Sequence, residues 1–198
     1  MKFDAVHDLQ NIYRKVLNTM SRPGQLENIA AVSAKLNLEI AASKNLTALL
    51  LTLLDGEVRF CFVAQADKKA ADKINQLTYA AQVAAAEADY LVVTNQTTAQ
   101  ELQTALAAAR IGTLSDPHES ATVILEVDSL TDGVELLLSG PGIKDTNKLQ
   151  LVVKHDWLAA RNQKVAEFPL GIDLILLDAQ GNMACLPRTT KIKQQGER

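Results

Sequence analysis

Long apolar stretches are missing from this sequence. The longest strongly apolar run, Ala48–Leu54, is interrupted by Thr52, whereas a helix that crosses a membrane needs about 20 apolar residues. Near the N-terminus, Asp4 stands where a secretory signal would lead into its apolar core. We therefore expect no membrane partner and a cytoplasmic location.

Aromatic residues and positive charge are also scarce. Aromatic side chains make up 4% of the 198 residues, and the formal net charge is −3. Proteins that bind nucleic acids usually carry a strong excess of Lys and Arg, and base stacking needs aromatic side chains. We expect no nucleic-acid partner. The composition is still compatible with binding of a small anionic ligand, because such a ligand needs only a few well-placed cations.

The chain has few residues that suit a metal or disulfide site. Its two cysteines, Cys61 and Cys185, each lie in an apolar, strand-like run with no Cys or His nearby at metal-ligand spacing. We expect two buried free thiols in a reducing compartment and no metal site. The histidines His7, His118 and His155 belong to different elements, and each is either an exposed imidazole or, for His7 and His155, a general base.

Length and composition predict one α/β domain spanning residues 1–198. Hydrophobic residues make up 47% of the chain, and a chain of this size buries roughly 70% of its unfolded surface. Residues 1–24 are expected to form an N-terminal helix and turn, because apolar residues recur at helical spacing from Val6 to Met20 and Pro23-Gly24 ends the pattern. The polar residues 191–198 are expected to be a flexible tail.

Helical and strand-like segments alternate along the rest of the chain. Alternation predicts crossover connections and a sheet covered on both faces, and residues 178–182 have the composition of a hairpin turn. A second antiparallel pair is expected between the strands of Val123 and Leu136. The expected fold is a three-layer α/β/α domain with a mixed sheet. Helices are predicted over 38–54, 67–79, 98–110 and 154–164, and strands over 25–32, 57–63, 90–93, 121–127, 134–138, 171–177 and 183–186.

Two groups of polar residues at chain turns are candidates for anion binding. Arg14 and Ser21 lie toward the end of the first helix, and Arg188 and Thr189 follow the last strongly apolar strand. An Arg fork with hydroxyl neighbours suits the oxygens of a phosphate or phosphonate. The alternative is that Arg188 pairs with a carboxylate such as Asp173 or Glu167 and has a structural role.

A glycine-containing segment, Ser139–Ile143, is the nearest approach to a ligand-binding loop. Its glycines would let backbone amides come close to a phosphate, but Pro141 removes one donor. The segment is either an ordinary turn or a ligand loop.

These segments together resemble the PhnH family of the bacterial carbon–phosphorus lyase system. The resemblance spans nearly the whole chain, although residues 64–110 match loosely. It rests on Tyr13-Arg14, Leu17, Met20-Ser21, Pro23-Gly24, Ser139-Gly140, Gly142-Ile143, Phe168–Ile175 and Pro187-Arg188-Thr189-Thr190, in that order.

The resemblance implies a function and a set of partners. The family works with sibling subunits PhnG, PhnI, PhnJ and PhnL to form a ribose 1-phosphonate 5-triphosphate from ATP and an alkylphosphonate during phosphate starvation. It forms homodimers when alone. By match to the motifs, Arg14, Ser21, Arg188 and Thr189 would bind substrate. Two roles stay open, namely a subunit that contributes to substrate binding and a non-catalytic scaffold.

The resemblance also implies a fold, which is that of pyridoxal-phosphate-dependent transferases in a shortened form without the cofactor. We therefore expect no pyridoxal phosphate. Such a cofactor would need a Schiff-base lysine, and the sequence alone leaves Lys148 and Lys191 open for that role.

Overall fold

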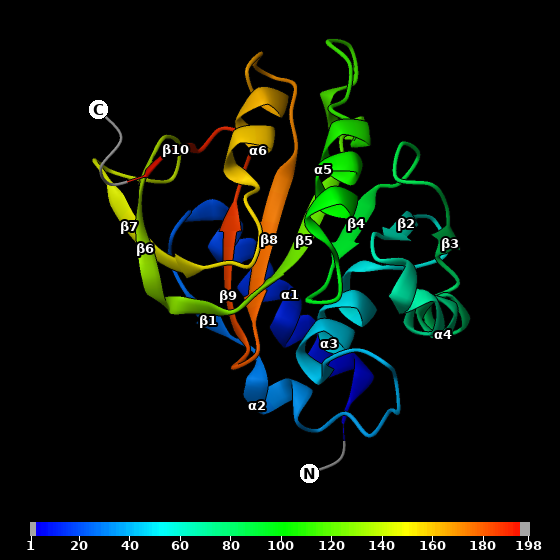
Figure 1. The fold of residues 1–198 in the computed structure, drawn as a ribbon. Coiled ribbons are helices and arrows are strands. Elements are labelled where there is room, and N and C mark those ends of the chain that lie inside the picture. The colour runs from blue at the N-terminus through cyan, green and yellow to red at the C-terminus, as the bar shows by residue number, and fades with distance from the viewer. Residues whose placement is uncertain (1–2, 195–198) are drawn as a thin grey trace.

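The computed structural model describes residues 3–194, which contain a seven-stranded mixed sheet and a separate three-stranded sheet. Figure 1 shows the small sheet at one end of the molecule, far from β2, β3 and α4 at the other end. The large sheet has the strand order β1-β9-β8-β5-β4-β2-β3. Its strands are β1 (Glu27–Asn28), β2 (Arg59–Phe62), β3 (Ala81–Gln82), β4 (Tyr90–Val93), β5 (Thr122–Val127), β8 (Asp173–Asp178) and β9 (Asn182–Leu186).

The large sheet combines parallel and antiparallel pairing, as the sequence predicted. Strands β3, β2, β4, β5 and β8 run parallel to their neighbours, while β9 is antiparallel to β8 and β1 is antiparallel to β9. The predicted hairpin is the β8–β9 pair, in which Ile175 lies opposite Cys185.

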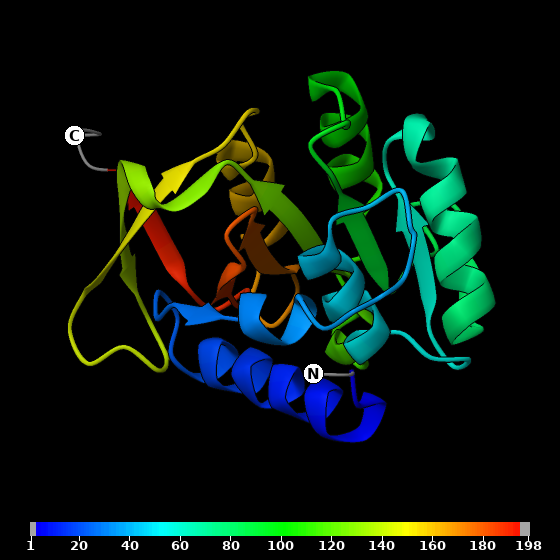
Figure 2. The ribbon, with the colours of Figure 1, turned by 90° about the horizontal axis from the view of Figure 1, so that it is seen from below.

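Helices cover both faces of the large sheet, and on one face they share the layer with the small sheet. The buried residues of α1 to α4 pack on one face, and those of α5, α6 and the small sheet pack on the other. Figure 2 shows α1 and α3 on the side opposite α5 and α6. The helices are α1 (Ala5–Ser21), α2 (Ala30–Ser33), α3 (Lys44–Leu53), α4 (Lys68–Thr78), α5 (Ala99–Ala108) and α6 (Leu158–Lys164), with 3-10 turns at Gln65–Asp67 and Pro117–Glu119.

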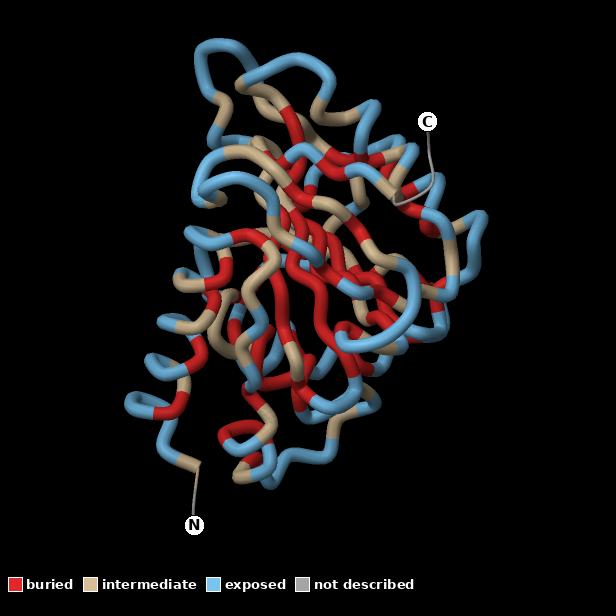
Figure 3. The backbone as a smooth tube through the Cα atoms, turned by 90° about the vertical axis from the view of Figure 1, so that its left-hand side faces the viewer, coloured by how far each residue is buried: buried red, intermediate tan, exposed pale blue. Residues whose placement is uncertain are grey.

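Side chains on the central strands point alternately to the two faces of the sheet and pack into two separate cores. On β5, Ile124 belongs to the core under α1 to α4, whereas Val123 and Leu125 belong to the core on the other face. On β8, Ile175 belongs to the core under α1 to α4 and Leu176 to the core on the other face. This is the burial expected for strands with both faces covered, and Figure 3 shows the buried residues concentrated along the central strands.

The small sheet corrects two predictions. It consists of β6 (Ser129–Ser139), β7 (Asn147–Val152) and β10 (Lys191–Gln194), in the order β10-β6-β7. The expected pairing of the Val123 and Leu136 strands is wrong, because Leu136 lies opposite Leu149 and Gln194 instead. Residues 191–194, expected in a flexible tail, form β10, which buries Ile192 against the rest of the small sheet. Residues 195–198 lie outside the described part of the chain.

Several element boundaries also differ from the predictions. The expected strand over 25–32 is only the short β1, followed by α2, and the expected helix over 38–54 begins at Lys44 because the Ser43 side chain accepts from the Leu46 N–H and caps it. The helix expected from residue 154 begins at Leu158. Strand β7 was not predicted, although Leu149 and Leu151 are buried and alternate with exposed neighbours. Among residues 3–194, no helix has both the length and the apolarity to span a bilayer.

Candidate functional site

Three of the segments that carry the sequence motifs meet at the turn between β6 and β7. Gly140 and Gly142 in this turn both have positive φ, 129° and 82°. A Cβ at Gly140 would lie 2.8 Å from the carbonyl oxygen of Thr189, and a Cβ at Gly142 would collide with the carbonyl oxygen of Ser21. The turn therefore needs glycine at both positions, and it brings Ser21 and Thr189 to its two sides.

The predicted residues Arg14 and Ser21 lie on the exposed surface of α1. The Ser21 hydroxyl donates to the carbonyl oxygen of Asn18 at 2.9 Å. Arg14 is exposed two turns earlier on the helix. The two side chains share one face of α1, because seven residues separate them. The structure does not bring Arg14 to the turn that Ser21 contacts.

The third predicted residue, Arg188, is part of a network with Asp173. Its backbone N–H donates to Asp173 Oδ1 at 2.7 Å, and its Nη2 lies 2.5 Å from Asp173 Oδ2. Nη1 donates to the carbonyl oxygen of Pro117 at 2.7 Å, and Nη2 also donates to the hydroxyl of Ser120. The geometry thus matches the structural alternative, in which a carboxylate neutralises Arg188.

The fourth predicted residue, Thr189, lines a cavity of about 520 Å³. The cavity lies between α6, the chain that joins β9 to β10, and the segment of Phe168 and Leu170. Its lining contains three cationic side chains and no carboxylate. The lining residues used below are Arg161, Phe168, Arg188, Thr189, Thr190 and Lys191.

Arg161 is the residue at this cavity that the sequence analysis missed. It is 1% exposed, and burial lowers its pKa to about 10, which leaves it charged at neutral pH. Its Nη2 donates to the carbonyl oxygens of Pro187 at 2.8 Å and Arg188 at 3.3 Å, and its Nη1 donates to Asn162 at 3.2 Å. It makes no ion pair within residues 3–194. A buried guanidinium without a carboxylate is unusual.

The carboxyl end of the parallel strands, where open α/β sheets usually bind ligands, is occupied by the protein's own polar groups. Ser43 donates to Glu126 at 2.9 Å, and the Thr94 hydroxyl donates to Asp67 at 2.5 Å. Burial raises the pKa of Glu126. The cavity that remains beside Glu126 is about 10 Å³, about the space of one water molecule.

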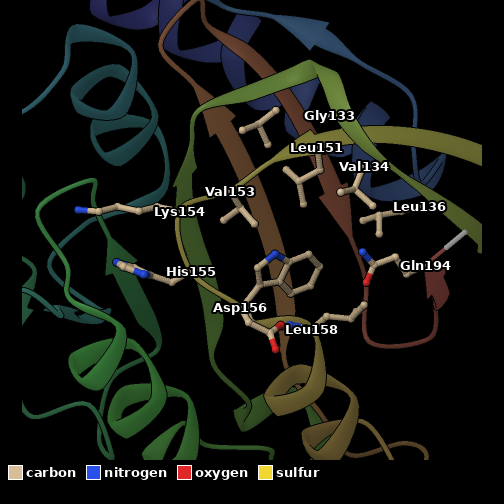
Figure 4. Close-up of a pocket in the computed structure, with 12 residues that line it drawn as sticks. Gly133, Val134, Leu136, Leu151, Val153, Lys154, His155, Asp156, Leu158 and Gln194 are labelled. Carbon is tan, nitrogen blue, oxygen red and sulfur yellow. Dashed lines mark hydrogen bonds between the residues drawn. The ribbon is translucent and has the colours of Figure 1, made fainter. Parts of the chain in front are cut away.

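A second sizeable cavity, of about 390 Å³, lies between the small sheet and α6 (Figure 4). Its wall is mainly apolar and includes Val134, Leu136 and Leu151, while Lys154 and His155 point toward β4 and α5. His155 Nε2 lies 3.1 Å from the carbonyl oxygen of Thr97. A carbonyl only accepts, so this nitrogen carries the proton and does not serve as a base there.

The remaining candidates for chemistry are dispersed. His7 and His118 are exposed and lie on α1 and the 3-10 turn at Pro117–Glu119. Lys148 pairs with Glu135 at 2.8 Å on the small sheet. In the described part of the chain, no three His, Cys, Asp or Glu side chains gather at metal-binding distance.

Comparison with known proteins gives one family over almost the whole chain. Residues 2–193 match the family described as bacterial phosphonate metabolism protein (PhnH). The chain is 30% identical over 188 residues to HtxG of Stutzerimonas stutzeri, assigned as a C–P lyase subunit, with 94% of this chain and 87% of that protein covered. It is 28% identical over 197 residues to the alpha-D-ribose 1-methylphosphonate 5-triphosphate synthase subunit PhnH of Rhizobium meliloti, with 97% and 94% covered.

Proposed function

The chain belongs to the PhnH family of bacterial phosphonate metabolism proteins, as its motifs predicted, and from this premise we propose that it is a subunit of a carbon–phosphorus lyase complex. In the proposed reaction, an alkylphosphonate oxygen forms a bond to C1′ of ATP as the bond from C1′ to adenine breaks, which yields a ribose 1-phosphonate 5-triphosphate. The sibling subunits PhnG, PhnI, PhnJ and PhnL are the proposed partners. The proposed setting is the cytoplasm during phosphate starvation.

The observation that carries this proposal is the match to the PhnH family over residues 2–193. Two relatives that align over most of their length support it, one assigned as a C–P lyase subunit and one named as a subunit of the methylphosphonate triphosphate synthase. The family motifs also meet in space, because the turn at Gly140 and Gly142 contacts both Thr189 and Ser21.

Within the complex, we propose that this subunit contributes a surface for substrate anions and that other subunits supply the reacting groups. The four expected site residues have different roles in this proposal. Thr189 lines a cationic cavity. Arg14 and Ser21 are exposed on α1 and would reach a substrate at an interface with a sibling subunit. Arg188 would shape the cavity, since Asp173 already neutralises its guanidinium.

The test of membership is co-purification of the tagged protein with its sibling subunits after expression of the whole operon. We expect one stable complex that forms the ribose 1-phosphonate 5-triphosphate from ATP and methylphosphonate, and that loses this activity when this chain is omitted. A chain that purifies alone under these conditions, with activity unchanged in its absence, would contradict the proposal.

A non-catalytic scaffold is the second candidate, and the exposed face of α1 favours it. Val6, Tyr13 and Leu17 on this helix are 74%, 48% and 51% exposed. Their spacing places them along one stripe of the helix, which is the pattern of a helix that docks on a partner. We propose that this stripe contacts a second copy in the free homodimer or a sibling subunit in the complex. Sedimentation of Leu17→Glu tests it, and an unchanged oligomeric state would argue against it.

We also propose that the protein needs no pyridoxal phosphate, although its fold would be a shortened relative of the transferases that use it. The purified protein should be colourless, and after incubation with the cofactor, borohydride reduction and desalting, its mass should show no covalently attached pyridoxyl group. A covalently retained chromophore would contradict the proposal.

A further inference from the structure

The cavity beside Thr189 carries more positive charge than the protein itself neutralises. Arg161, Arg188 and Lys191 line it, and its lining contains no carboxylate. Asp173 forms an ion pair with Arg188, and its single negative charge also acts on Arg161 without forming an ion pair with it. Two positive charges, one buried and one exposed, therefore remain at the cavity without a matching negative charge in the lining.

Two buried polar atoms on the cavity residues lack hydrogen-bond partners among residues 3–194. These atoms are Nε of Arg161 and the hydroxyl oxygen of Thr190. Both residues are 1% exposed. A buried donor without a partner costs free energy, and native proteins keep few of them. Because both residues line the same cavity, one ligand there would meet the unneutralised charge and bring acceptor oxygens to these donors.

We propose that this cavity binds a tetrahedral phosphorus oxyanion, with Arg161, Thr190 and Lys191 as its principal protein ligands. An oxyanion with several acceptor oxygens matches two cations and two hydroxyl groups, those of Thr189 and Thr190. A guanidinium and a hydroxyl are common ligands of such oxygens. Both residues line the cavity but are 1% exposed, so binding in this proposal includes a turn of the Arg161 and Thr190 side chains that brings the covered donors to the ligand.

The apolar part of the cavity lining suits a ligand that also carries a small apolar group. Val165, Phe168, Leu170 and Ile192 line the same cavity. Phe168 is 76% exposed, so its ring is free to cover a bound group. The volume of about 520 Å³ exceeds that of an inorganic phosphate and leaves room for an organic substituent.

The choice of phosphorus as the central atom rests on the proposed function, whereas the charge and the unpartnered donors are independent of it. Both an alkylphosphonate and the triphosphate of ATP present the chemistry that the cavity selects. The binding experiment therefore includes methylphosphonate, ATP and inorganic phosphate as separate ligands, with acetate as a planar control.

Isothermal titration of the full-length protein with each ligand tests the proposal at one fixed ionic strength. The first variant is Thr190→Val, which removes the unpartnered hydroxyl and keeps the shape of the side chain. We expect binding of the phosphorus ligand to weaken about tenfold, as for a lost hydrogen bond to a charged group, while thermal unfolding stays at the wild-type temperature. Tighter binding of methylphosphonate than of ATP would assign the cavity to the phosphonate, and the reverse order would assign it to the nucleotide.

The second variant is Lys191→Gln, and Lys193→Gln is its matched control. Both lysines are exposed on β10, two residues apart on the same side of the strand, but only Lys191 lines the cavity. We expect Lys191→Gln to weaken binding about two- to fivefold, the range for an exposed charge pair, and Lys193→Gln to leave it unchanged.

Three results would overturn the inference: no heat of binding with any phosphorus ligand at millimolar concentration, equal binding of acetate, or wild-type affinity in both Thr190→Val and Lys191→Gln. Co-purification with the sibling subunits is scored separately. A chain that joins the complex but binds no anion would refute this inference and the proposed anion surface, and leave the proposed membership of the complex intact. A chain that binds the anion but joins no complex would do the opposite.

Discussion

Asp173 accepts three hydrogen bonds from Arg188, one from its backbone N–H and two from its guanidinium. Asp173 begins β8 and Arg188 follows β9, so this contact closes the open end of the β8–β9 hairpin. The same guanidinium donates to Pro117 and Ser120, which precede β5. One side chain therefore connects three segments at the amino end of the central strands.

Replacement of Arg188 by Ala should destabilise the fold. The variant leaves Asp173 half-buried without its cation and frees the carbonyl of Pro117. We expect the free energy of unfolding to fall by about 2–4 kcal/mol, as when one partner of a largely buried ion pair is removed. Urea unfolding followed by circular dichroism measures it.

The matched control is Lys148→Ala, which breaks the Lys148–Glu135 pair. The Lys148 side chain is 63% exposed, so we expect a loss of about 0.5 kcal/mol or less. If Arg188→Ala unfolds at the wild-type urea concentration and the assembled complex loses phosphonate binding, Arg188 is a substrate ligand and its structural role is wrong.

The ion pairs of Asp89 predict a pH dependence of stability. Burial alone would raise the pKa of Asp89, but the hydrogen bonds and charge of Arg59, with the charge of Arg110, outweigh it and hold that pKa below 3.8. A lowered pKa stabilises the folded state above pH 3.8, and this contribution disappears as the pH falls through the folded value.

The variant Asp89→Asn tests this sign. It should unfold at lower urea than the wild type at pH 7 and pH 5, and the difference should shrink below pH 3.8, where the wild-type carboxyl also becomes neutral. A difference that stays constant down to pH 2.5 would show that Asp89 acts through packing and not through its charge.

The two thiols should differ strongly in reactivity. Cys185 is fully buried, burial raises its pKa to about 12, and its sulfur lies 3.0 Å from the Thr19 hydroxyl. Cys61 is half-buried, and burial raises its pKa as well. Since the thiolate is the reactive form, labelling with a disulfide reagent at pH 8 should modify Cys61 slowly and Cys185 only on unfolding.

Cys61→Ser separates the two thiols. In this variant the native protein should show no labelling over the time in which the wild type incorporates one equivalent, and urea should restore one equivalent. Rapid native labelling of Cys61→Ser would mean that the core around Cys185 opens more readily than its burial implies.

The sequence predicted those parts of the fold that depend on local chemistry. Helix α5 lies within the predicted range 98–110 and begins with a capping box of Thr98 and Glu101, and the Tyr90–Val93 strand has its predicted bounds. The mixed sheet followed from the alternation of elements together with the hairpin composition of residues 178–182. The small sheet could not be predicted, because its β6–β10 pairing joins strands far apart in the sequence and no local signal sets their register.

The candidate site, too, was predictable from sequence only where local motifs mark its residues. Motif matching found Thr189 and Arg188 as candidate ligands. The structure shows that Asp173 forms an ion pair with Arg188 and so neutralises its charge. Arg161 was missed even though the sequence carried a signal. It stands four residues from both Trp157 and Val165, so it interrupts the apolar stripe of its helix. A cation on a buried stripe indicates either an internal partner or a ligand.

The capping box of α5 should contribute measurably to stability. The Thr98 hydroxyl accepts from the Glu101 N–H, and the Glu101 carboxylate accepts from the Thr98 N–H at 2.9 Å. Thr98→Ala should lower the free energy of unfolding by about 1 kcal/mol. Thr104→Ala, an exposed threonine within the same helix, is the control and should leave stability unchanged or raise it slightly. Equal effects of the two variants would mean that the cap is not what stabilises this helix end.

The positive φ and close contacts of Gly142 predict a structural role for this residue in the turn between β6 and β7. Gly142 has φ of 82°, and an added Cβ would collide with the Ser21 carbonyl and approach Pro23 Cδ to 3.0 Å. Gly142→Ala combines the cost of a left-handed backbone, about 1–2 kcal/mol, with that collision, so it should lower the free energy of unfolding by at least that amount. Gly56→Ala is the control, because its Cβ would lie 3.7 Å from Tyr79 and its φ is not positive. If Gly142→Ala is as stable as Gly56→Ala but fails to bind methylphosphonate, the turn is a ligand loop and not a structural one.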